Sequence, residues 1–329
     1  MTIFGEIEAR HNHCINKSGG PFKMSSYLQE TVCYIGQNEV FEEGEKTFQK
    51  LRGITICAKQ IERVSHYYGN KLEEKLQDSI AEGRPYTYTD KTGRYYAMVD
   101  GSMLLTREEK WKEIKLGRIF NERDNIEINK GRKTITKSLY VSHLGGHNEF
   151  TKKMEYYLDS IKNLVFIADG AKWIWNWISA VYPDSIQILD YFHAKEHLCD
   201  FAKAYFNDVK QSEKWIDEQC QLLLNDKVKQ VIKNIQHLPH NTKTQSIQSA
   251  LVQYYKTNSN RMMYKTFSDE GVFIGSGAIE SAHKHVLQQR LKLSGQRWTS
   301  VGLQQVANLR VAFNSDQWNQ VIEFSKSAA

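Results

Sequence analysis

The stretch from Leu164 to Leu198, LVFIADGAKWIWNWISAVYPDSIQILDYFHAKEHL, decides the fold class. Two apolar runs, Leu164–Ala168 and Ile186–Leu189, are too short for helices and suit buried strands. Tryptophans at helical spacing fill the segment between them. A β-α-β unit of this length predicts parallel strands with a crossover helix. Asp169 and Asp190 each follow a strand, so they fall where open α/β sheets place their sites.

The sequence before this stretch extends the sheet. Apolar patterning predicts strands over 94–99, 111–120 and 139–142, and a helix over 149–158. The first of these strands ends in Asp100-Gly101. The predicted order is therefore β, β, β, α, β, α, β, α, an α/β fold with a mixed sheet flanked by helices.

The remaining segments predict four parts in the chain. A helical region (1–90) precedes the first part of the core (91–200), and a strand-free helical insertion (201–270) separates it from the last part of the core (271–329). In the first region, two short helices around Gly53 have the outline of a helix-turn-helix in which Arg52, Lys59 and Arg63 would face phosphates. An ordinary helical hairpin fits the same pattern equally well.

Composition limits the partners and the compartment. The 329 residues carry a formal net charge of +6, which permits a polyanionic partner without requiring one. Five cysteines without a C-x-x-C pair argue against a disulfide framework and for a reducing cytoplasm. No apolar run reaches membrane-spanning length, and the first residues lack the pattern of a secretory signal, so a membrane partner is not expected.

Three acids form the principal candidate site. Asp100 and Asp169 follow strands, and Glu280 lies in the first turn of a late helix. Taken singly, an Asp-Gly pair is an ordinary turn and an acid suits a helix start. Together, three carboxylates can bind two Mg²⁺ (or Mn²⁺) ions, which would activate a nucleophile and stabilise the leaving oxygen of a phosphodiester.

A basic segment follows Glu280. No acid occurs between Glu280 and Asp316, and this span contains Lys284, Arg290, Lys292 and Arg297. Its sign suits a DNA backbone, and a solvated helix face is the alternative. Trp298 in the same segment would stack on a base or pack internally, and packing is favoured.

A competing motif lies at the start of the last helix of the opening stretch. His193, Glu196 and His197 match H-x-x-E-H, the arrangement in which two histidines on one helix face bind zinc and the glutamate acts as base. A zinc peptidase would need a third protein ligand from elsewhere in the chain. Histidines that simply pack beside Asp190 are a further alternative.

Three blocks resemble a known group. IADGAKWIWNWI, YPDSIQILDYFHAKEHL and GSGAIESAHKHVLQQRLKLSGQRWT look like bacterial insertion-sequence transposases of the ISKra type, which are similar to the Mutator-like group. The likeness extends from about Ser25 to Phe313. It implies an RNase H-like core and a DDE transposase that cleaves insertion-sequence ends and transfers the DNA strand.

The resemblance also implies roles and partners. Asp100, Asp169 and Glu280 match the three metal-holding acids, and Asp190 with His193 matches an Asp-x-x-His motif that positions a metal or DNA. DNA, a homo-oligomeric synaptic complex and a cytoplasmic, nucleoid-associated location follow from it. Members usually carry an amino-terminal segment with paired cysteines, which this sequence lacks. A truncated, catalytically inactive DNA-binding remnant is therefore the alternative.

Overall fold

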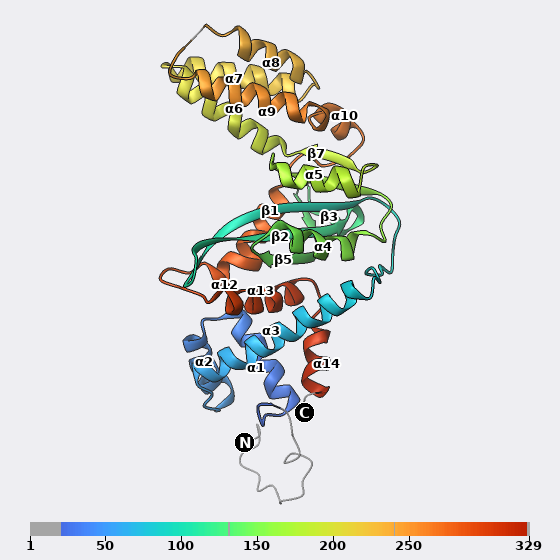
Figure 1. Ribbon diagram of the computed structural model, residues 1–329, viewed down its shortest axis with the longest axis vertical. Coiled ribbons are helices and arrows are strands. Elements are labelled where there is room, and N and C mark those ends of the chain that lie inside the picture. The colour runs from blue at the N-terminus through green and yellow to red at the C-terminus, as the bar shows by residue number, and fades with distance from the viewer. Residues whose placement is uncertain (1–20, 131, 240, 328–329) are drawn as a thin grey trace, which may run out of the picture. The chain divides into compact units, whose positions relative to one another are not determined.

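The computed structural model describes residues 21–130, 132–239 and 241–327. Its centre is a five-stranded mixed sheet in the order β5-β2-β1-β6-β7, accompanied by a separate two-stranded sheet, β3-β4 (Figure 1). The strands are β1 (Tyr95–Thr106), β2 (Lys110–Asn121), β3 (Asn125–Asn129), β4 (Arg132–Ile135), β5 (Leu139–Leu144), β6 (Leu164–Ala168) and β7 (Ile186–Leu189).

Helices account for most of the remaining described residues. They are α1 (Ser26–Asn38), α2 (Phe41–Arg52), α3 (Ala58–Ala81), α4 (His147–Leu158), α5 (Lys172–Val181), α6 (Tyr191–Tyr205), α7 (Val209–Leu223), α8 (Val228–His237), α9 (Gln245–Asn258), α10 (Tyr264–Asp269), α11 (Gly277–Ala282), α12 (Gln289–Leu291), α13 (Ser300–Asn314) and α14 (Asn319–Ser327). Short 3-10 turns, η2 (Glu122–Asp124) and η3 (Ser259–Arg261), and a π-helical segment, η4 (His283–Gln288), complete them.

The β-α-β unit predicted from the opening stretch is confirmed. β6 and β7 have the predicted bounds, α5 connects them, and they pair in parallel from Val165–Ile186 to Ala168–Leu189. β6 also pairs in parallel with β1, from Tyr95–Leu164 to Val99–Ala168. The three parallel strands β1, β6 and β7 therefore run side by side with a common register.

Two expectations about strands need correction. The strand predicted to end at Val99 continues as β1 to Thr106, so Asp100 lies inside a strand and not at its end. Its pairing with β6 nevertheless ends at Val99. The polar stretch 121–137, in which no strand was expected, contains the β3–β4 hairpin, whose isoleucines Ile126 and Ile128 are exposed. The stretch is mainly polar, and its few apolar side chains do not face a core, so its sequence gave no clear signal for a half-buried strand.

The chain divides into two compact units. Unit 1 comprises residues 1–92, 101–162 and 281–329, of which the first 20 and the last two lie outside the described residues. Unit 2 comprises residues 93–100 and 163–280. In unit 2, the described residues of the predicted insertion form helices joined by turns and contain no strand. α6 leads into the insertion, and the Tyr255 hydroxyl of α9 donates to the Ala194 carbonyl of α6 at 2.8 Å.

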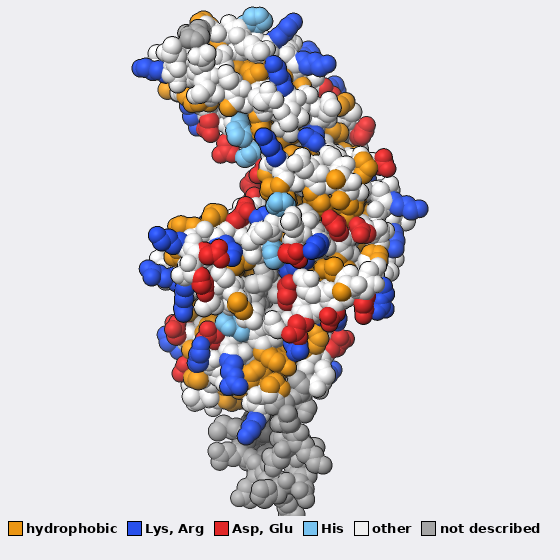
Figure 2. All heavy atoms as spheres, viewed as in Figure 1, with side chains coloured by type: hydrophobic (Ala, Val, Ile, Leu, Met, Phe, Trp, Pro, Cys, Tyr) orange, Lys and Arg blue, Asp and Glu red, His pale blue; other side chains and the backbone are white. Residues whose placement is uncertain are grey.

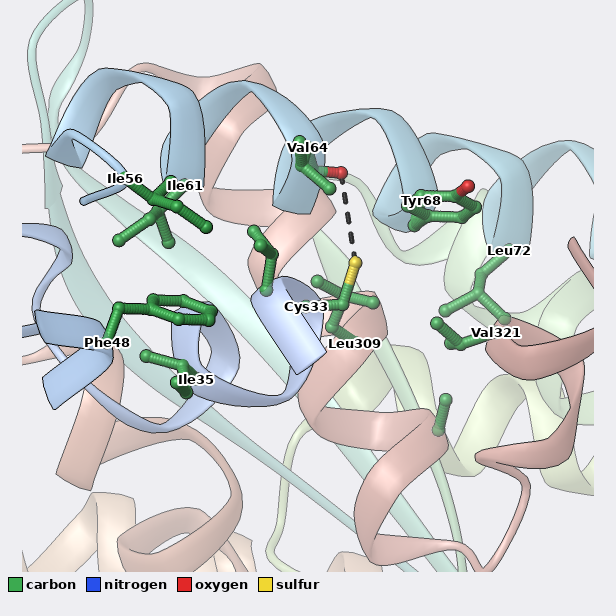
Figure 3. Close-up of a cluster of buried hydrophobic side chains, with 12 residues drawn as sticks. Cys33, Ile35, Phe48, Ile56, Ile61, Val64, Tyr68, Leu72, Leu309 and Val321 are labelled. Atoms are coloured by element: carbon green, nitrogen blue, oxygen red, sulfur yellow. Dashed lines mark hydrogen bonds between the residues drawn. The ribbon is translucent and has the colours of Figure 1, made fainter. Parts of the chain in front are cut away.

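The described part of the N-terminal region is helical and packs on the last helices of the chain. Cys33, Phe48, Ile61 and Val64 from α1–α3 form a buried cluster with Leu309 of α13, as Figure 3 shows. α2 ends at Gly53, whose φ of 64° is the left-handed conformation that favours glycine. Two helices joined by a turn at Gly53 are therefore present, although α3, with 24 residues, is not the short helix that the sequence predicts. This arrangement fits a helix-turn-helix and an ordinary helical hairpin alike, and DNA binding by it stays a prediction.

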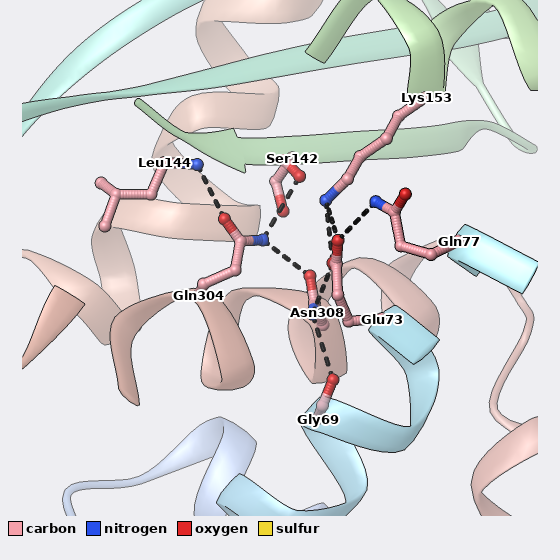
Figure 4. A network of polar contacts seen from close by, with 8 residues as sticks. All are labelled: Gly69, Glu73, Gln77, Ser142, Leu144, Lys153, Gln304 and Asn308. Carbon is pink, nitrogen blue, oxygen red and sulfur yellow. Dashed lines mark hydrogen bonds and ion pairs between the residues drawn. The ribbon is translucent and has the colours of Figure 1, made fainter. Parts of the chain in front are cut away.

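A polar network connects α3, α4 and α13 within unit 1 (Figure 4). The ammonium of Lys153 lies 2.7 Å from Glu73, although its side chain is only 1% exposed. Asn308 donates to Glu73 and to the carbonyl of Gly69, at 3.1 and 3.0 Å. Burial tends to raise the pKa of Glu73, but Lys153 and its amide donors outweigh burial, and the pKa is lowered overall. The network therefore holds α3, α4 and α13 together, and breaking its buried ion pair is expected to destabilise unit 1.

Candidate acidic site at the strand ends

Three acids come directly after the paired, parallel parts of β1, β6 and β7. The last paired residues, Val99, Ala168 and Leu189, lie at one level because Val99 pairs with Ala168 and Ala168 pairs with Leu189. Asp100, Asp169 and Asp190 are the next residues of their strands. Neighbouring strands are about 4.8 Å apart, so the register alone brings the three acids to one edge of the sheet. We call Asp100, Asp169 and Asp190 the acid edge.

Asp169 sits in a tight turn between β6 and α5. Its carboxylate accepts a hydrogen bond from the Ala171 N–H at 3.0 Å, and its carbonyl accepts one from the Trp175 indole at 2.7 Å. These bonds come from neutral donors, which fix the turn without cancelling the carboxylate charge. Asp169 is half-buried. Asp100 is half-buried as well and makes interactions of its own.

Asp190 has a different environment. It is 3% exposed, and its two carboxylate oxygens accept from the Phe192 N–H at 2.8 Å and from the Ser276 hydroxyl. The Tyr191 N–H donates to the Ile274 carbonyl at 2.9 Å, which adds a backbone tie to the same loop. Asp190 therefore caps α6 and fastens the 274–276 loop to the end of β7.

Glu280 is positioned through this loop. It is exposed on α11, and its N–H donates to the Ser276 carbonyl, four residues earlier, at 3.4 Å. One helical turn, about 6 Å of rise, thus separates Glu280 from the residue that contacts Asp190. Both residues belong to unit 2, so this placement is internal to that unit.

The acids are brought near one another but do not form a closed metal shell. Within residues 21–130, 132–239 and 241–327, no three His, Cys, Asp or Glu side chains make a group that could hold a metal ion. The same statement applies to the H-x-x-E-H helix. There, the rings of His193 and His197 are 4.8 Å apart, and His193 Nδ1 lies 3.5 Å from a Glu196 oxygen.

An aromatic wall that the sequence reasoning missed stands beside Asp169. The Tyr254 ring lies against Gly170, where an added Cβ would come within 2.1 Å of Tyr254 Cε2, so only glycine fits. The His197 ring is 4.5 Å from the Tyr254 ring. Burial, with the nearby acids Asp169 and Asp190, raises the pKa of Tyr254. Burial, followed by the charge of His193, lowers the pKa of His197. Both groups are therefore uncharged at neutral pH.

The basic segment after Glu280 does not present all its charges to solvent. Lys284, Lys292 and Arg297 are exposed, as predicted for phosphate contacts. Arg290 contradicts that prediction, because it is 1% exposed and donates to the Gly36 carbonyl at 3.1 Å.

Arg290 is enclosed by aromatic rings. Its guanidinium lies 4.8 Å from the centre of the Phe41 ring and 4.9 Å from that of Trp298. Burial, and then the charge of Arg310, lowers its pKa to about 10. Trp298 itself is buried and donates to the Leu291 carbonyl at 3.1 Å, which confirms the packing interpretation.

The basic residues of the N-terminal helices are exposed but engaged. Arg52 donates to the Tyr27 hydroxyl at 2.5 Å, Lys59 pairs with Glu62 at 2.6 Å, and Arg63 lies over the Phe22 ring. The exposed Lys59–Glu62 ion pair is expected to contribute little to stability. On the face shown in Figure 2, basic and acidic side chains are intermixed.

The fold and this edge define a mixed α/β protein with an acid edge on three parallel strands. The chain belongs to an uncharacterised protein family, UPF0236, whose model matches residues 146–327, more than half of the chain. Asp169, Asp190 and Glu280 lie inside the matched range, and Asp100 lies before it. No curated protein matches the chain. Among the described helices, none combines the length and apolarity needed to cross a membrane.

Proposed function

We propose that this chain is a DDE transposase of the ISKra type, which cleaves DNA at insertion-sequence ends and transfers the strand. The observation that carries the proposal is the common register of β1, β6 and β7, because it puts Asp100 and Asp169 next to each other independently of side-chain rotamers. Glu280 completes the triad, one helical turn beyond the loop fastened to Asp190.

The strand order supports an RNase H-like core. β1 and β2 are joined by residues 107–109 alone, a link too short for a crossover, so they run antiparallel. β5 is antiparallel to β2, whereas β6 and β7 are parallel to β1. Three antiparallel strands followed by two parallel ones, with the acids on β1 and after β6, is the arrangement that the resemblance implies.

The donor chemistry of the acids fits Mg²⁺ or Mn²⁺. Both ions prefer carboxylate oxygen, which Asp100, Asp169 and Glu280 supply. Bare carboxylates repel one another, so the three acids are expected to close around cations and not in their absence. When bound, a metal pair supplies an activated oxygen nucleophile and stabilises the leaving oxygen.

Asp190 acts in this proposal as a positioning residue. Both of its oxygens already accept hydrogen bonds, and it is almost fully buried. It holds the loop from which the Glu280 helix starts. His193, in the first turn of α6, is half-buried and is the group of the motif that would contact DNA.

DNA and a second copy of the chain are the proposed partners. Lys284, Lys292 and Arg297 would contact the phosphate backbone near Glu280, and Arg52, Lys59 and Arg63 would contact it at the helix-turn-helix. Strand transfer at two ends requires a synaptic homo-oligomer on DNA, which places the protein at the nucleoid.

The test is cleavage of labelled duplex carrying the element's own ends, with Mg²⁺ or Mn²⁺. Wild type should nick at the ends, and Glu280→Gln should not. Glu218→Gln, an exposed acid on α7 of the same unit, is the matched control and should nick like wild type. Binding without nicking by any of the three would establish a DNA-binding remnant instead. Neither binding nor nicking would reject both, and zinc binding by His193 and His197 would then be measured.

A further inference from the structure

A groove in unit 2 opens next to Asp169. It runs between α5 and α9, starts at Gly170, and has a volume of about 460 Å³. This lies within the range of roughly 300–1,000 Å³ that is typical of small-molecule sites. The side chains that give it chemical character are Lys172, Trp175, Asn176, Gln253, Tyr254 and Arg261.

The groove lining contains a stacked arginine. The guanidinium of Arg261 lies 4.4 Å from the centre of the Trp175 ring. Arg261 donates to Gln187 at 3.1 Å and to Asn258 at 3.3 Å, so it is held in place by neutral acceptors. A fixed cation over an indole provides a positive, planar surface.

The groove lining also contains a hydrogen-bond donor that has no acceptor in the part of the chain that the structure describes, the hydroxyl of Tyr254. The buried hydroxyl of Tyr254 has no hydrogen-bond partner among the described residues. It lies close to Gly170, since a Cβ placed there would be 2.7 Å from this oxygen. A buried hydroxyl without a partner costs free energy, which a ligand that accepts its hydrogen would recover.

We propose that this groove takes one unstacked nucleotide of the DNA strand processed at Asp169. The proposal rests on the proposed function for the identity of that strand. No acidic side chain lines the groove in the part of the chain that the structure describes, and Lys172 and Arg261 give it the sign that a phosphate requires.

The groove also matches the base itself. Asn176 and Gln253 present amide groups, which pair with the donor and acceptor edges of bases. Aromatic and guanidinium planes stack on bases with little regard to sequence. A base held here would be next to Asp169, because Gly170, which follows Asp169, lines the groove.

The test fills the groove without touching the acids. Ala250 is exposed on α9 and lines the groove, whereas its neighbour Ser249 is exposed and does not line it. Ala250→Trp should weaken binding of a labelled oligothymidylate by about 10-fold, the scale of one stacked base. Ser249→Trp should bind like wild type, and a fully paired duplex should bind equally to all three proteins. Fluorescence anisotropy in EDTA measures this without any cleavage.

Photo-crosslinking supplies an independent readout. An oligonucleotide carrying 4-thiothymidine should crosslink to wild type in peptides from α5 or α9, and Ala250→Trp should lose that crosslink. Equal oligothymidylate affinity for Ala250→Trp and Ser249→Trp, or crosslinks confined to other peptides, would overturn the proposal.

The ligand's source is tested by competition. Free thymidine monophosphate should compete much more weakly than the oligonucleotide, because a strand adds phosphate contacts outside the groove. Equal affinity would assign the groove to free nucleotides and overturn the strand assignment. Since these measurements need no metal and no nicking, a wild type that fails to nick but shows the Ala250→Trp effect would reject the transposase and retain the groove.

Discussion

Unit 1 and unit 2 each contain partly or fully buried acids, and the partners of these acids differ between the two units. In unit 1, Glu73 is matched by the buried ammonium of Lys153 and by two amide donors. In unit 2, Asp169 and Asp190 are held by backbone N–H groups and a hydroxyl. The first arrangement cancels charge, and the second fixes geometry while leaving charge in place.

This difference separates structural charge from charge available to a ligand. A buried ion pair holds its neighbouring elements together, and removal of one partner lowers the stability of the fold because the other charge is left buried and unpaired. Carboxylates fixed by neutral donors keep a negative potential, which is what a divalent cation requires. The comparison therefore assigns stability to the network around Glu73, and it leaves the acid edge as the part of the molecule that the proposed metal chemistry would use.

The largest expected effect comes from breaking the unit 1 pair. Lys153→Met should lower the free energy of unfolding by about 3–5 kcal/mol, because it leaves Glu73 half-buried without its cation. Urea denaturation followed by circular dichroism measures the change. Lys152→Met is the matched control, since Lys152 pairs with Glu149 on the exposed side of the same helix. Its effect should stay below about 1 kcal/mol. Equal effects of the two changes would contradict the distinction.

The next effect concerns Asp190 and separates a positioning residue from a metal ligand. Asp190→Asn keeps an oxygen for the Phe192 N–H and an amide that can donate to Ser276, so nicking should stay within about 10-fold of wild type. Asp190→Ala removes both bonds and should reduce nicking by about 100-fold, the upper range for groups that orient metal ligands.

Asp169→Asn is the reference for a group that holds metal and should abolish nicking. If Asp190→Asn is as inactive as Asp169→Asn, the charge of Asp190 is required and the positioning role is wrong. Unchanged melting curves for the Asn variants would exclude unfolding as the cause.

A third test compares two arginines of the basic segment. Arg290→Met should destabilise unit 1 by about 2–3 kcal/mol through lost hydrogen bonding and lost contact with Phe41 and Trp298. Arg297→Met, which is exposed, should change stability by about 0.5 kcal/mol or less. It should instead weaken DNA binding and reduce the salt slope by about one. If Arg290→Met were as stable as wild type and its DNA binding showed the smaller dependence on salt, Arg290 would be a DNA contact and its structural role would be wrong.

Much of the fold was readable from the chain because the decisive elements are local. Leu164–Ala168 and Ile186–Leu189 are short, mainly apolar runs that each end at an acid, and strands formed over those bounds. The helices of 201–270 likewise follow from their apolar spacing. The continuation of β1 past Asp100 was missed, because an Asp-Gly pair usually ends a strand and here does not.

The site was harder to read because it depends on partners distant in sequence. Asp100 and Asp169 were identifiable as acids after apolar runs, while the Asp190–Ser276 bond spans 86 residues and left no local signal. The same holds for Tyr254 against Gly170 and for Arg290, whose burial depends on Phe41. A run of basic residues in the sequence does not indicate which of them are exposed to solvent and which are buried.

The last expected effect is the pH dependence of unit 1. Burial, and then the charge of Lys153, lowers the pKa of His143 from 6.5 to about 4. The unfolded chain therefore takes up a proton on His143 that the folded chain resists, so stability is lost as pH falls from about 6.5 toward 4. Glu73, whose pKa is lowered from 4.5, loses its contribution as pH falls through and below 4.5, so its loss overlaps the acid end of this range. His143→Gln should flatten the stability profile between pH 6.5 and 4, measured by urea unfolding at several pH values. Parallel profiles for the variant and wild type would place the acid-sensitive group elsewhere.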